Sequence, residues 1–149
     1  MEDLESILRF ENGTLRNENF HHYDHIKMAW LYLNRYPVLE ALGKFSEALK
    51  RFATAHGKPD LYHQTITWSY IFIIHERRER SGNEQTWEEF ATNNVDLFEW
   101  RGGILDSYYD SETLWSDFAR KVFVFPKATL KLRKVEQREC HGPRSDKSP

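Results

Sequence analysis

Apolar residues recur at intervals of three and four along most of this chain, and that spacing is typical of helices that bury one face. Turn-forming residues such as Asn12-Gly13 and Gly82-Asn83 separate the apolar segments. The pattern predicts helices over approximately residues 4–11, 20–36, 37–55, 60–80, 86–101 and 111–121.

Particular residues fix several of the predicted helix ends. Gly57 and Pro59 end the third helix, because glycine adopts the left-handed conformation after a helix and proline prevents its continuation. Asp60 is the expected N-cap of the fourth helix, and Ser111 that of the sixth. The segment 86–89, TWEE, has the spacing of a capping box and predicts the start of the fifth helix.

The fourth predicted helix carries apolar side chains on two faces, so we expect it at the centre of its domain. The segment 122–126, VFVFP, favours an extended conformation but has no partner strand, which predicts an extended segment packed on the helices. We therefore predict an all-α fold in which residues 1–130 form a single compact bundle of about five to six helices. Residues 131–149 are predicted to form a flexible, disordered basic tail.

Charge is distributed unevenly along the chain. The formal net charge of the 149 residues is −2, which argues against a general nucleic-acid-binding protein. Residues 127–149 nevertheless contain seven Lys or Arg and three Asp or Glu. Acidic residues are interspersed in this tail and the main body is acidic, so a solubilising tail is favoured over contact with an anionic surface.

The sequence predicts a cytoplasmic protein. The N-terminus lacks the basic-then-apolar order of a secretory signal, and the longest apolar run, around residues 68–74, is far shorter than the ~20 residues of a membrane span. The single cysteine, Cys140, lies in the tail and excludes an internal disulfide, which fits a reducing compartment. Trp87 and Trp100 could form a homodimer contact or belong to the core.

Three histidines are the candidate chemical site. His22 and His25 are three residues apart on the apolar stripe of the second predicted helix, and His63 precedes the apolar part of the fourth. Imidazoles that point inward need hydrogen-bonding partners or a metal. Zn and Fe both accept imidazole ligands, and three histidine ligands leave one coordination position open for water or substrate. The alternative is that each imidazole bonds a carbonyl or a tyrosine hydroxyl.

The surroundings of these histidines add two possible supporting residues but no clear carboxylate. Tyr62 adjoins His63 and could support a ligand, and Thr67, one turn further, could orient a bound water. Asp24 points about 100° away from His25 on the helix, which makes it a poor co-ligand. Among the other histidines, His56 falls in a turn and is not a candidate.

Three motifs resemble those of an uncharacterised family of small bacterial all-helical proteins. Residues 22–33 contain H-x-x-H followed by A-x-x-Y-L, and residues 62–67 read Y-H-x-T-h-T, where h is apolar. Residues 108–126 contain the third pattern, with Tyr, Leu, Ser, Ala-Arg and a final Phe-Pro. The resemblance singles out the same three histidines but implies no activity. The position of Gln64 is commonly Glu in that family, and an amide cannot serve as a general base.

Three functions remain open at this point. The first is a metal-dependent enzyme that acts on a small-molecule substrate, with His22, His25 and His63 as ligands of a divalent transition metal, Zn or Fe. The second is a metal-free enzyme or small-molecule binder in which a histidine acts as general base, with an apolar pocket beside it. The third is a non-catalytic helical interaction module whose buried histidines are satisfied by hydrogen bonds.

Overall fold

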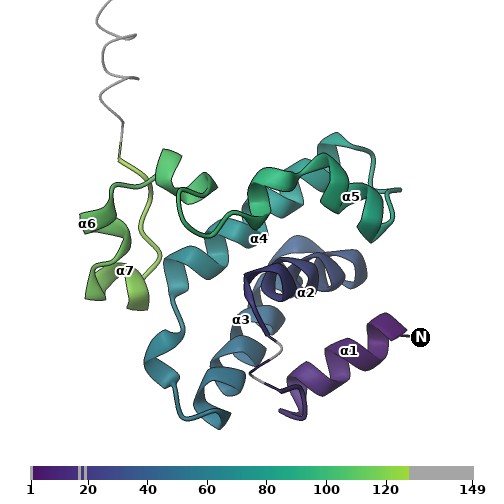
Figure 1. Cartoon of the computed structure of the whole chain (residues 1–149), viewed down its shortest axis with the longest axis horizontal. Coiled ribbons are helices and arrows are strands. Elements are labelled where there is room, and N and C mark those ends of the chain that lie inside the picture. The colour runs from purple at the N-terminus through teal and green to yellow at the C-terminus, as the bar shows by residue number, and fades with distance from the viewer. Residues whose placement is uncertain (1, 17, 19, 128–149) are drawn as a thin grey trace, which may run out of the picture.

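The computed structural model describes residues 2–16, 18 and 20–127, and every regular element among them is helical, as predicted (Figure 1). Seven α-helices and three short 3₁₀ helices follow one another in this part of the chain. In order they are α1 (Glu2–Glu11), α2 (His22–Arg35), α3 (Val38–Ala55), η2 (Pro59–Leu61), α4 (Gln64–Arg80), α5 (Trp87–Asn93), η3 (Val95–Phe98), η4 (Ile104–Ser107), α6 (Ser111–Leu114) and α7 (Asp117–Lys121).

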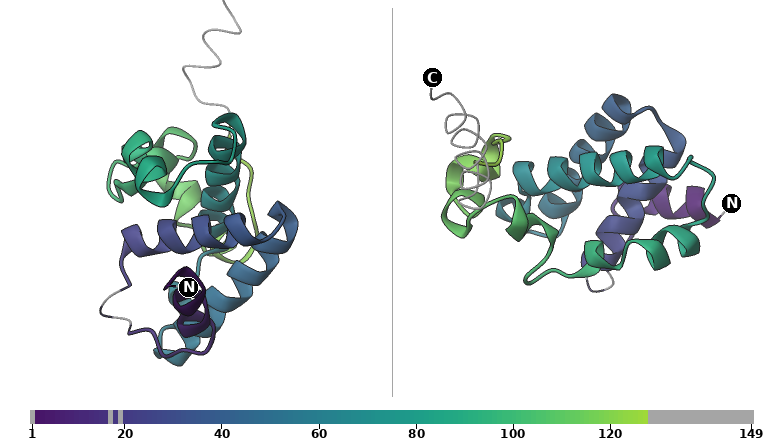
Figure 2. Two further views of the ribbon diagram at one scale, coloured as in Figure 1. Left: turned by 90° about the vertical axis from the view of Figure 1, so that its right-hand side faces the viewer. Right: turned by 90° about the horizontal axis from the view of Figure 1, so that it is seen from above.

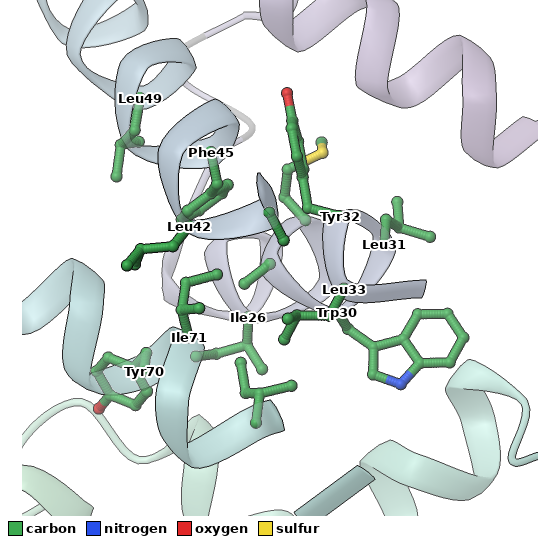
Figure 3. Packing of buried hydrophobic residues seen from close by; sticks show 14 of the residues in the cluster. Ile26, Trp30, Leu31, Tyr32, Leu33, Leu42, Phe45, Leu49, Tyr70 and Ile71 are labelled. Carbon is green, nitrogen blue, oxygen red and sulfur yellow. The ribbon is translucent and has the colours of Figure 1, made fainter. Parts of the chain in front are cut away.

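The core lies where α1, α2, α3 and α4 pack together. Figure 3 shows side chains of α2, including Ile26, between Phe45 of α3 and Ile71 of α4. Phe10 of α1 covers α3, with its ring 5.9 Å from that of Phe45 and 5.4 Å from that of Phe52. Burial of each such side chain contributes about 1.5–3 kcal/mol, so the four-helix core is the main source of stability.

Helix α4 is central, as its two apolar faces predict. It packs against α2, α3 and α7, and Thr65, Ile71 and Ile74 on it are fully buried. Helices α6 and α7 lie beside its first turns, whereas α5 lies toward its other end (Figures 1 and 2). This arrangement brings the start of α4 close to the C-terminal part of the described chain.

Several predicted boundaries are wrong, and local hydrogen bonds explain the differences. Asp60 is not the N-cap of α4; it lies in η2, and the His63 ring accepts a bond from the Ile66 amide instead (3.2 Å). Ser111 is the first residue of α6, and Asp110 caps that helix by accepting from the Thr113 amide (2.7 Å). The capping box at residues 86–89 is confirmed.

Two predicted helices are also shorter than expected. Helix α5 ends at Asn93, because the side chain of Asn94 donates to the Phe90 carbonyl (2.8 Å) and closes the last turn. The predicted sixth helix is divided into α6 and α7, since Ser116 is extended and its hydroxyl caps α7 through the Ala119 amide (3.1 Å).

The segment 122–126 is extended and packs on α4, as predicted. Its Phe123 ring stacks on Trp68 at 5.6 Å. The predicted tail, residues 131–149, and the boundary at residue 130 lie outside the described residues. None of the helices within the described part of the chain is long and apolar enough to cross a membrane.

Candidate functional site

A cavity of about 450 Å³ lies between α2, α3 and the start of α4. Most of its wall is apolar or aromatic, and five histidines contribute to it. The apolar and aromatic residues of the wall are Phe20, Ile26, Ala29, Phe45, Leu49, Phe52, Ala53, Leu61, Tyr62, Ile66, Tyr70, Trp100 and Trp115, and the histidines are His21, His22, His25, His56 and His63. The three histidines singled out from the sequence therefore meet at one cavity.

His25 lies against the apolar wall, and its ring centroid is 4.2 Å from that of Phe20. Burial, together with the neighbouring His22, lowers the pKa of His25 to about 4. The imidazole is therefore neutral at pH 7, with one nitrogen that donates and one that accepts. No hydrogen bond within the described residues uses either ring nitrogen, so both can serve a ligand.

His22 has one ring nitrogen engaged. Its Nε2 donates to the Leu97 carbonyl at 2.8 Å, which leaves Nδ1 as the acceptor. Burial lowers the pKa of His22, although the bond to Leu97 opposes that shift. The ring contacts Tyr70 and Trp100 at centroid distances of 5.2 and 5.1 Å, so it forms part of the aromatic wall.

His63 has both ring nitrogens engaged. Its Nδ1 accepts from the Ile66 amide and caps α4, while Nε2 donates to the Leu114 carbonyl at 2.6 Å. Burial lowers the pKa of His63, and the Arg120 charge contributes to that shift. The imidazole is therefore held neutral as a single tautomer that joins α4 to α6.

These bonds bear on the metal prediction. A metal ligand must offer a ring nitrogen without a proton, and His63 would have to give up its bond to Ile66 or that to Leu114 before it could bind one. Within the described residues, no group of three or more His, Cys, Asp or Glu is placed so that it could hold a metal ion. The three histidines share a cavity, and the metal centre stays a prediction.

His56, whose place in a turn predicts no role in the site, also belongs to this cavity. It follows the last residue of α3, and its ring lies 4.4 Å from that of Phe52. Its Nε2 is buried and has no hydrogen-bond partner among the described residues. The signal was present in the sequence, because His56 continues the stripe of Phe45, Leu49 and Phe52 by one more turn.

The two predicted supporting residues also line the cavity. Thr67 is buried on α4, and Tyr62 is half-buried and donates to the side-chain oxygen of Gln64. Burial raises the pKa of Tyr62, so its hydroxyl remains protonated at neutral pH. Both hydroxyls stand at the wall as polar groups in otherwise apolar surroundings.

Thr65, between these residues, points away from the cavity and binds the C-terminal segment. Its single hydroxyl proton is shared between the carbonyls of Ala119 (2.7 Å) and Val122 (3.0 Å), and its oxygen accepts from the Val124 amide (3.2 Å). This differs from the usual bond of a helical threonine to a carbonyl one turn earlier. With His63, it ties the first turn of α4 to residues 114–124.

Comparison with known proteins adds no relative to these observations. No family model, no curated protein and no solved structure matches this chain.

Proposed function

We propose that this protein binds a small, largely apolar molecule in the cavity and recognises its polar atoms with imidazole nitrogens. The observation that carries the proposal is an apolar cavity of about 450 Å³ lined by His25 and His56, in which the buried Nε2 of His56 has no hydrogen-bond partner among the described residues. Small-molecule sites are typically cavities of about 300–1,000 Å³ with apolar walls and a few placed polar groups.

A role in binding is better supported than a role as general base. A general base works best when its pKa is close to the working pH, and the pKa of His25 is lowered to about 4. A neutral imidazole can still donate one hydrogen bond and accept another. His25 therefore suits recognition of a ligand hydroxyl, carbonyl or ring nitrogen.

Filling the cavity is expected to weaken binding. The probe is N-phenyl-1-naphthylamine, an uncharged aromatic molecule whose fluorescence rises in apolar surroundings. We expect saturable binding to the full chain, and Ala53→Phe should weaken it by about tenfold or more, because Ala53 lines the cavity. Fluorescence titration gives the dissociation constants, and circular dichroism verifies that each variant is folded.

The matched control is Ala55→Phe, which adds the same ring at an exposed position of the same helix. It should leave the dissociation constant unchanged. Absence of saturable binding, or equal binding by all three proteins, would contradict the proposal.

The metal-dependent enzyme predicted from the sequence is separated from this proposal by elemental mass spectrometry of the purified protein. Because both nitrogens of His63 are engaged, we expect substoichiometric Zn and Fe. A full equivalent of either metal that is lost in His22→Ala, His25→Ala and His63→Ala variants would instead establish the three-histidine centre.

A further inference from the structure

We infer that the ligand of this cavity is an organic acid, whose anionic group is bound by Arg120 and Lys58 and whose apolar body fills the remaining space. The inference rests on the proposed binding function and specifies the class of ligand. Two observations support it: the charges of the residues that line the cavity, and the absence of Arg120 and Lys58 from the ion pairs between described residues.

The wall of the cavity is unlike the rest of the chain in charge. The whole sequence has 23 Asp or Glu and 21 Lys or Arg. Among the residues that line the cavity, Arg120 and Lys58 are cationic and none is acidic. The lowered pKa values of His22, His25 and His63 keep these three imidazoles neutral at pH 7, so Arg120 and Lys58 are the permanently charged side chains of the wall.

Arg120 is placed to bind an anion. Its Nη1 donates to the Asp60 carbonyl at 2.7 Å, which fixes the guanidinium at the edge of η2, two residues from Lys58. A guanidinium has five N–H donors, so this bond leaves others for a planar carboxylate. None of the ion pairs between described residues includes Arg120 or Lys58, whereas Arg77 is paired with Asp96 at 2.7 Å.

The position of Arg120 and Lys58 at one edge of the cavity sets the orientation of the ligand. Arg120 is close enough to His63 to lower its pKa, and the ring of His63 is 5.7 Å from that of Trp115. The acid group would lie at this edge, beside His63. The apolar wall formed by Phe45, Leu49 and Phe52 would then take the body of the molecule.

A matched pair of probes tests the inference. 8-Anilino-1-naphthalenesulfonate has the framework of N-phenyl-1-naphthylamine with one sulfonate added. At low salt we expect the full chain to bind the anionic probe about tenfold more tightly than the uncharged probe. This preference for the anionic probe should fall as ionic strength rises. Arg120→Gln should weaken the anionic probe by about tenfold and leave the uncharged probe unchanged.

Three variants keep the test specific. Arg120→Lys retains the charge and should retain most of the preference. Lys121→Gln removes a charge from an exposed neighbour on the same helix and should change nothing. Ala53→Phe should weaken both probes, which shows that the anionic probe occupies the cavity and not a surface cation.

The two proposals fail in different ways. If both probes bind in the cavity with equal affinity, or if Arg120→Gln weakens both equally, the organic-acid inference is wrong while the binding function stands. If neither probe binds, or Ala53→Phe affects neither, the binding function itself is wrong. Thermal unfolding followed by circular dichroism establishes that the Arg120 variants remain folded.

Discussion

A Thr65→Val substitution is expected to lower the free energy of unfolding by about 3 kcal/mol. Valine has nearly the same shape, so the loss comes from hydrogen bonding. The Thr65 hydroxyl is fully buried and bonds Ala119, Val122 and Val124, and its removal leaves these three backbone groups without that partner. A buried backbone group that loses its partner costs about 1–3 kcal/mol, which applies to the Ala119 carbonyl, and the part-buried groups of Val122 and Val124 add less. Urea denaturation followed by circular dichroism measures the change.

Thr67→Val is the matched control for this prediction. Thr67 is buried on the same helix but faces the cavity, so the change should be below about 1 kcal/mol. A loss below about 1 kcal/mol in Thr65→Val, no larger than that in Thr67→Val, would show that residues 119–124 do not depend on the Thr65 hydroxyl.

The same contacts give a structural reason for two of the sequence motifs. His63 and Thr65 belong to the segment Y-H-x-T-h-T, and they bond Leu114, Ala119 and Val122 in the third motif segment. The partners are more than 50 residues away along the chain. A sequence shows that both segments are present but not that one contacts the other. From the sequence alone, a chemical role of His63 and Thr65 could therefore not be distinguished from a role in packing.

The fold was largely predictable because its determinants are local. Helical spacing of apolar residues predicts α1 to α4 within a few residues, and the box at 86–89 predicts the start of α5. The start of α4 was missed since His63, an unusual N-cap, takes the place of Asp60. The division of α6 from α7 depends on the Ser116 hydroxyl, which favours a cap over a helix interior.

The candidate site was predictable in part. His22, His25 and His63, which the sequence singles out, line one cavity, and their role as metal ligands stays a prediction. Which ring nitrogens are engaged could not be predicted, because it depends on the carbonyls of Leu97 and Leu114 from distant segments. The cations of the wall were missed for a similar reason: an isolated Lys or Arg in sequence looks like a solvated charge.

Acidification from pH 7 to pH 4 is expected to lower the free energy of unfolding by about 3 kcal/mol through His25 alone. The pKa of His25 is about 4 in the folded protein, against 6.5 for an unperturbed histidine. Between these values the unfolded chain binds the proton and the folded protein does not, so stability falls as the pH falls through this window. Well above pH 6.5 both states are neutral, and His25 no longer changes the stability. The lowered pKa values of His22 and His63 act in the same direction.

Urea denaturation at a series of pH values, on protein treated with a chelator, measures this dependence. The pKa values of Asp96 and Asp110 are lowered from 3.8, so these carboxylates change the stability in a more acidic pH range than His25 does. His25→Phe should reduce the slope of the free energy of unfolding against pH, between pH 4 and pH 6.5, by close to one proton. An unaltered slope in His25→Phe would mean that the imidazole is protonated in the folded protein. A protonated His25 would make this wall of the cavity cationic, and the ligand's acid group would then have a second place to bind.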